Sequence, residues 1–170
     1  MMKLIIIILL VSIVSSGDIH YHQCSTYGGR TYQLNVGANG VQLVQSITLH
    51  KDYTAHRIDS TQNGVGPTGT VEYPPYTALI GEWRCVGRNQ VELRFINYDL
   101  RVANSSVPAS VSETRYTWTF TKDHDHFGGT FQWTLYPIGT DPTRPGTTPS
   151  YGGTQGPYNI QSGNRLHFFP

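Results

Sequence analysis

The sequence has 170 residues, a length that fits one domain, with 12 Lys and Arg against 11 Asp and Glu. Charged residues make up 14%, against about 25% in an average soluble protein. The near-zero balance and the lack of any charge run exclude an acidic tail, and they exclude binding to nucleic acid through neutralised phosphates.

Residues 1–17 are predicted to be a secretory signal peptide. Lys3 gives a positive start, an unbroken apolar run covers 4–11, and the sequence then becomes small and polar. The apolar run is shorter than the ~20 residues of a membrane-spanning helix. Cleavage after Ser16 or after Gly17 fits the pattern. Residues 18–170 are therefore expected to form one secreted, extracellular domain with no membrane association after cleavage.

Two further features suit the secretory pathway. Cys24 and Cys85 are the only cysteines in the chain, and an oxidising compartment favours a disulfide between them. Two buried thiols, or pairing between molecules, are the alternatives. Asn104 begins an N-glycosylation sequon in the polar stretch 101–110, which is predicted to be a surface loop.

The remaining elements are predicted to be strands. Apolar and polar residues alternate with a period of two, the pattern of a half-buried antiparallel strand. The alternation is clearest in residues 32–36, 91–95, 116–120 and 131–135. Further strands are predicted at 41–50, 52–59, 78–86 and 164–169, which makes about eight.

Turn signals favour a meander of hairpins. Asn39-Gly40, 87–89 and 123–126 each connect neighbouring strands, and 60–77 and 137–157 are predicted to be long loops. The fold class expected is all-β, an antiparallel up-and-down barrel of about eight strands. A sandwich is the alternative, but Trp83 lies only two residues before Cys85, which is the wrong spacing for an immunoglobulin domain.

Several short segments resemble small secreted lipocalin-like (calycin-type) barrel proteins. They are 47–52 (ITLHKD), 81–87 (GEWRCVG), 91–95 (VELRF) and 115–130 with its FGGT end, and the similarity spans about residues 45–136. The resemblance implies a β-barrel whose interior can hold a small apolar molecule. Many proteins of this kind have no known function.

Aromatic residues at inward positions are the candidates for ligand contact. They could line a pocket, or they could fill the interior themselves, since an eight-stranded barrel is just wide enough for either. These predicted pocket-lining residues are Trp83, Tyr116, Trp118, Phe120, Phe131 and Trp133.

Other chemistry is weakly indicated. His124 and His126 flank Asp125, but a polar hairpin turn explains them better than a metal site, and no metal or cofactor is expected. The common catalytic motifs are absent, and Glu82, Glu92 and Glu113 are expected to face solvent.

The function expected is binding of a small, largely apolar ligand inside the barrel. The alternatives are a barrel enzyme of isomerase or cyclase type, comparable in fold to allene oxide cyclase-like or dirigent-like barrels, and a ligand-free extracellular structural protein. The sequence assigns no oligomeric state.

Overall fold

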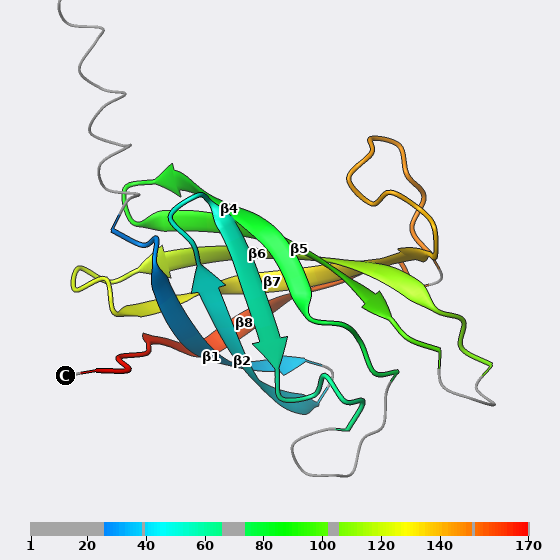
Figure 1. Ribbon diagram of the computed structural model, residues 1–170, viewed down its shortest axis with the longest axis horizontal. Helices are drawn as coiled ribbons and strands as arrows, with labels where there is room; N and C mark the ends of the chain where they lie inside the picture. Colours follow the sequence, from blue (N-terminus) through cyan, green and yellow to red (C-terminus); the bar gives the residue numbers. More distant parts are fainter. Residues whose placement is uncertain (1–25, 39, 66–73, 102–105, 151, 170) are drawn as a thin grey trace, which may run out of the picture.

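The computed structural model describes residues 26–38, 40–65, 74–101, 106–150 and 152–169. Within these ranges eight antiparallel strands follow one another around a closed barrel (Figure 1). They are β1 (Arg30–Ala38), β2 (Val41–Leu49), β3 (Thr54–Asp59), β4 (Leu79–Gly87), β5 (Gln90–Asp99), β6 (Ser110–Phe120), β7 (His126–Pro137) and β8 (Thr154–Arg165). The predicted fold class is confirmed.

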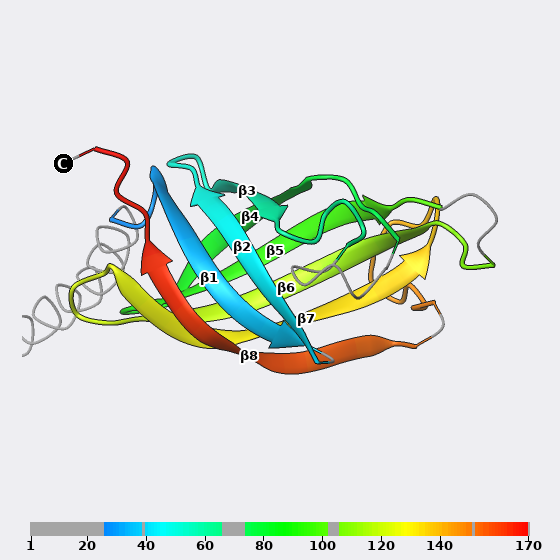
Figure 2. The ribbon, with the colours of Figure 1, turned by 90° about the horizontal axis from the view of Figure 1, so that it is seen from below.

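The barrel closes where β8 pairs with β1 (Figure 2). Both pairings of β8 are irregular: the register with β1 shifts between Asn35 and Val36, and the register with β7 shifts at two places. Such bulges bend a strand and increase its twist, which closure of a sheet requires.

The position of this last strand was predicted wrongly. The sequence pattern placed it at 164–169, whereas β8 occupies Thr154–Arg165. The long loop predicted at 137–157 therefore ends before residue 154. Because the β8 sequence TQGPYNIQSGNR holds one strongly apolar residue, Ile160, and two glycines, it shows no alternation. Pairing on both edges makes it a strand.

One half of the interior is filled by packed aromatic rings. Tyr27, from the segment before β1, covers this end of the barrel and stacks on Phe120 with ring centroids 4.2 Å apart. Trp118 stacks on Phe127 at the same centroid distance. This is the end at which the β2–β3, β4–β5 and β6–β7 hairpins turn, and we call it the closed end.

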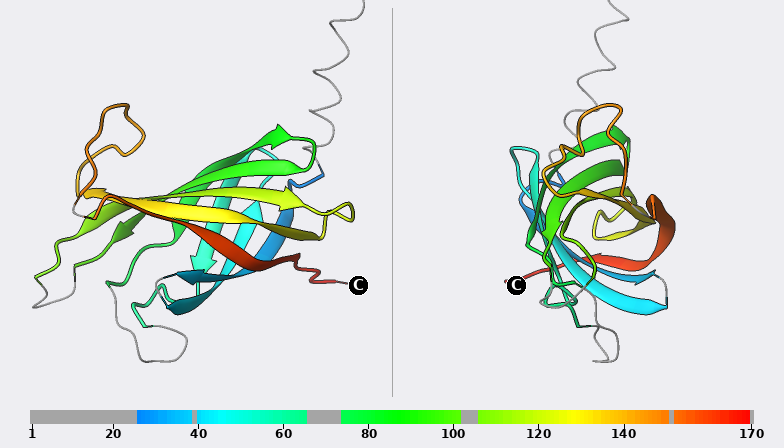
Figure 3. Two further views of the ribbon diagram at one scale, coloured as in Figure 1. Left: turned by 180° about the vertical axis from the view of Figure 1, so that it is seen from behind. Right: turned by 90° about the vertical axis from the view of Figure 1, so that its right-hand side faces the viewer.

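The opposite end, which we call the mouth, carries the longer connections. The β7–β8 loop stands there, far from the C-terminal end of the chain (Figure 3). It packs on the outer surface of the barrel, where Arg94 donates a hydrogen bond to the carbonyl oxygen of Pro142 at 3.4 Å.

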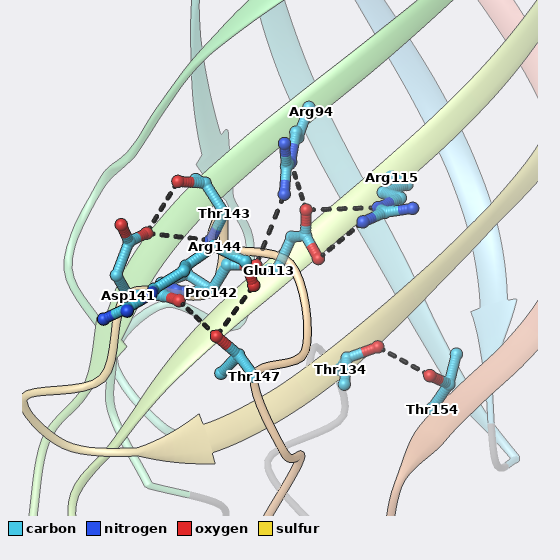
Figure 4. A network of polar contacts seen from close by, with 10 residues as sticks. All are labelled: Arg94, Glu113, Arg115, Thr134, Asp141, Pro142, Thr143, Arg144, Thr147 and Thr154. Carbon is cyan, nitrogen blue, oxygen red and sulfur yellow. Dashed lines mark hydrogen bonds and ion pairs between the residues drawn. The ribbon is translucent and has the colours of Figure 1, made fainter.

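Glu113 departs from its predicted exposure. It points outward, as expected, but its side chain is only 2% exposed. Arg94 forms an ion pair with it, and Arg115 donates to both of its carboxylate oxygens at 3.1 Å (Figure 4). A carboxylate can be buried in this way when two guanidinium groups bind it. Glu82 is exposed, and Glu92 is partly exposed and paired with Arg84.

Three features of the chain lie wholly or partly outside the described residues. They are the predicted signal peptide, Cys24, which is the predicted disulfide partner of Cys85, and Asn104. The disulfide and the glycosylation therefore stay predictions. Cys85 is half-buried and packs against the core cluster. No helix of the described chain is long and apolar enough to cross a membrane.

The packing of the closed end yields a test of the fold. A Cβ atom at Gly163 would overlap the ring of Phe127, and that ring is held by its stack on Trp118. We expect Gly163→Ala to lower the free energy of unfolding by about 1–3 kcal/mol, the usual cost of overpacking. Urea denaturation followed by tryptophan fluorescence would measure it.

Gly128→Ala is the matched control on β7, because a Cβ there meets no atom within 4 Å. It should change stability by less than about 0.5 kcal/mol. Equal effects of the two substitutions would contradict the packing described for the closed end.

Candidate functional site

A cavity of about 370 Å³ occupies the mouth half of the barrel. This is at the small end of the range of about 300–1,000 Å³ for ligand pockets. Its apolar wall is formed by Ala38, Leu43, Phe131, Trp133 and Leu135. Four residues from the connections at the mouth also line it: Pro74, Tyr76, Val107 and Pro108.

The strands create the cavity because their inward side chains become smaller and more polar toward the mouth. On β6 the inward residues run from Phe120, Trp118 and Tyr116 to Thr114 and Ser112. On β5 they run from Val91, Leu93 and Phe95 to Asn97 and Asp99. Bulky side chains fill the closed end, whereas small ones leave space at the mouth.

A belt of buried polar groups separates the two halves. Tyr116 donates its hydroxyl hydrogen to Gln45 Oε1 at 2.8 Å, and Gln45 Nε2 donates to Asp59 Oδ2 at 3.2 Å. Arg57 forms an ion pair with the same Asp59 oxygen through Nη2. The Arg57 guanidinium also lies over the Tyr116 ring, 5.6 Å from its centroid.

Burial and the Asp59 carboxylate together set the pKa values in this belt. Burial would lower the pKa of Arg57, but the Asp59 carboxylate and the neighbouring tyrosines outweigh it and raise that pKa above its ordinary value. Burial raises the pKa of Tyr116 and of Tyr76 above the ordinary tyrosine value. Arg57 therefore stays charged and both tyrosines stay protonated at neutral pH.

The belt has hydrogen-bonding capacity left over. Arg57 is 7% exposed, and its Nε and Nη1 atoms have no hydrogen-bond partner among the described residues. Asp59 Oδ1 is likewise unmatched within that part of the chain. An unsatisfied buried donor or acceptor costs about 1–3 kcal/mol, so such groups call for an explanation.

A second polar group lies in the cavity wall. Asp99 Oδ1 accepts a hydrogen bond from Asn97 Nδ2 at 2.9 Å, and Asp99 Oδ2 accepts one from Ser110 Oγ at 2.7 Å. Burial raises the pKa of Asp99, and the two hydrogen bonds only partly oppose this. No ion pair to Asp99 occurs among the residues that the structure describes.

The six aromatic residues singled out in the sequence divide between the two halves. Phe131 and Trp133 line the cavity, and Tyr116 lies in the polar belt. Trp118 and Phe120 are packed inside the closed end. Trp83 is 3% exposed near the same end, and its Nε1 donates to the His50 carbonyl oxygen at 2.9 Å.

Arg57, Asp59, Asn97 and Asp99 were missed by the sequence reasoning. For β5 a signal existed, because the alternation of Val91, Leu93 and Phe95 continues without a break to 97 and 99. For β3 the signal is misleading, since the apolar Ile58 is 60% exposed and the charged Arg57 points inward.

The histidine-rich β6–β7 turn is organised by hydrogen bonds. Asp123 accepts from Thr121 Oγ1 at 2.5 Å and from the Asp125 backbone N–H at 2.9 Å, and it pairs with His126 at 2.9 Å. His124 lies 3.1 Å from the Tyr27 hydroxyl. No group of three or more metal-ligating side chains is found in the described part of the chain.

Comparison of the chain with protein-family models, with curated proteins and with solved structures finds no match. The candidate site is therefore defined by its own geometry: a cavity with apolar walls, a buried arginine at the polar belt and a partly buried carboxylate in the wall.

The raised pKa of Asp99 makes a pH-dependent prediction. A carboxyl whose pKa is raised by folding binds its proton more tightly in the native state, so it destabilises the protein once the pH exceeds the pKa of the unfolded chain. We expect Asp99→Asn, which is nearly isosteric, to raise the melting temperature at pH 7.

The increase in melting temperature should become smaller as the pH falls, and it should disappear below 3.8, the ordinary pKa of an aspartate carboxyl. Thermal melts followed by circular dichroism between pH 3 and 8 would measure it. Glu82→Gln, at an exposed carboxylate, is the control. A gain for Asp99→Asn that is constant with pH would contradict the explanation.

Proposed function

We propose that this chain is a secreted binding protein that holds one small, largely apolar molecule in the mouth half of its barrel. The observation that carries the proposal is the division of the interior. One half is filled by side chains, while the other keeps a cavity of about 370 Å³ with apolar walls. An apolar ligand body in this cavity would remove the apolar side chains of its wall from water, which favours binding.

The aromatic side chains of the cavity support this proposal. Phe131 and Trp133 stack at a centroid distance of 5.8 Å, and Tyr158 of β8 stacks on Trp133 at 5.1 Å. Phe131 and Trp133 line the cavity, and their stacking, with Tyr158 stacked on Trp133, gives a ligand an apolar wall that needs no reordering. Preformed walls reduce the entropic cost of binding.

An isomerase or cyclase acting on a bound apolar molecule is the second candidate. It is favoured by Asp99, a carboxyl with a raised pKa in the wall of a pocket, since groups of this kind serve in acid–base catalysis. Binding alone does not require Asp99 to exchange a proton, whereas an enzyme using it would lose turnover and keep binding in Asp99→Asn.

Binding can be tested with N-phenylnaphthylamine, an apolar dye whose fluorescence rises in apolar surroundings. We expect saturable binding at one site per chain. Ser112→Trp should weaken it at least about tenfold, because Ser112 is a buried residue of the cavity wall and the larger side chain would occupy the space.

Thr119→Trp is the matched control, since Thr119 lies on the same strand but is exposed on the outer surface. It should leave the affinity unchanged. If the dye does not bind, or if both substitutions weaken it equally, the cavity is not the binding site.

Secretion is the second part of the proposal, and it is carried by residues 1–17 of the sequence. We expect a eukaryotic cell expressing the full chain to release a protein that begins at residue 17 or 18. Its unreduced mass should be two hydrogens below that of the thiol form because of a Cys24–Cys85 bridge, with any glycan at Asn104 added.

Intact-mass spectrometry of the medium before and after reduction would measure this. Asn104→Gln is the control for the glycan. Retention of the full-length chain in the cells would contradict secretion.

A further inference from the structure

The polar belt at the inner end of the cavity has a hydrogen-bonding pattern that a ligand can complete. Arg57 lines the cavity, and one of its guanidinium nitrogens, Nη2, is committed to Asp59. Its Nε and Nη1 atoms have no acceptor among the described residues, although only 7% of the residue is exposed. A charged group with incomplete hydrogen bonding therefore lies in the cavity lining. Because Nε and Nη1 have almost no accessible surface, a ligand oxygen would reach them after a shift of the Arg57 side chain.

Neighbouring acceptors in the belt are already engaged. Gln45 Oε1 accepts from Tyr116, and the Gln45 amide nitrogen donates to Asp59. Thr61 and Tyr76 share a hydrogen bond with each other at 2.8 Å. An acceptor brought into the cavity would consequently not displace any of these bonds.

The charges around the cavity argue against an anionic group. Arg57 is one positive charge, and Asp59 and Asp99 are two negative ones. Burial already disfavours the ionised form of Asp99. A ligand carboxylate would be a third negative charge beside a single cation in a site of low dielectric. An uncharged oxygen would accept from Arg57 without that repulsion.

Resting on the function proposed above, we propose that the ligand is an uncharged amphiphile, with a hydroxyl or carbonyl oxygen that accepts hydrogen bonds from Arg57. Its apolar body lies along Phe131, Trp133 and Leu135. The same charges disfavour the anion of a fatty acid whose apolar body has the same length.

Three probes of nearly equal size separate these features: phenylhexanol, its methyl isostere heptylbenzene, and phenylhexanoate. Each would displace N-phenylnaphthylamine from the wild-type protein at pH 7.5. We expect phenylhexanol to bind at least about tenfold more tightly than phenylhexanoate.

The matched variant is the double substitution Arg57→Met with Asp59→Leu. Replacing both members of a buried ion pair by apolar residues leaves no unpaired charge, so the fold should survive, and circular dichroism checks this. In the variant we expect the affinity for phenylhexanol to fall about tenfold. The affinities for heptylbenzene and the dye should equal or exceed those of the wild type.

If the dye fails to bind the wild-type protein, the proposed function and this inference are both overturned. If the dye binds but the double substitution changes the affinities for phenylhexanol and heptylbenzene equally, Arg57 does not recognise the oxygen and only this inference is overturned. Tighter binding of phenylhexanoate than of phenylhexanol in the wild type also overturns it, and that comparison holds even if the variant does not fold.

Discussion

The backbone hydrogen bonds between β8 and β1 close the barrel. They leave no open edge and so create an interior that the inward side chains of all the strands must share. The closing strand has little apolar content of its own, and its glycines permit the close approaches and bends that closure needs. At Gly163 the ring of Phe127 occupies the space of a side chain. The sheet thus closes around an aromatic cluster rather than around a uniform apolar core.

Inside the barrel, the size of the inward side chains determines which half is filled and which half contains the cavity. The closed end holds Trp118, Phe120, Phe127 and Tyr32 in contact with one another, with Tyr27 covering them. Toward the mouth, β5 and β6 present Asn, Asp, Ser and Thr on the same face. The change from bulky to small residues comes within one residue pair on the two strands, since Phe95 is paired with Thr114, and the connections at the mouth complete the cavity.

The buried polar belt gives the cavity its chemical character. A buried Arg57–Asp59 pair is weak evidence for stability, because desolvation offsets most of the attraction between the charges. Its presence at the inner end of a cavity, with two arginine nitrogens unmatched among the described residues, is better explained by recognition of a polar group. The outer ion pairs differ in this respect: Glu113 is matched by Arg94 and Arg115, so that cluster fixes the β7–β8 loop to the barrel.

Period-two alternation and Gly or Asn turns are local properties, so the all-β class, the hairpin order and seven of the strand positions could be predicted from the sequence. The same alternation indicated which aromatic residues point inward. The position of β8 could not be predicted, since that strand is specified by pairing on both edges and not by its own pattern. The tertiary structure alone also placed Arg57 inside and Ile58 outside, and buried Glu113 beneath a distant loop. Burial of such polar groups depends on partners far away in the chain, and no local pattern encodes those partners.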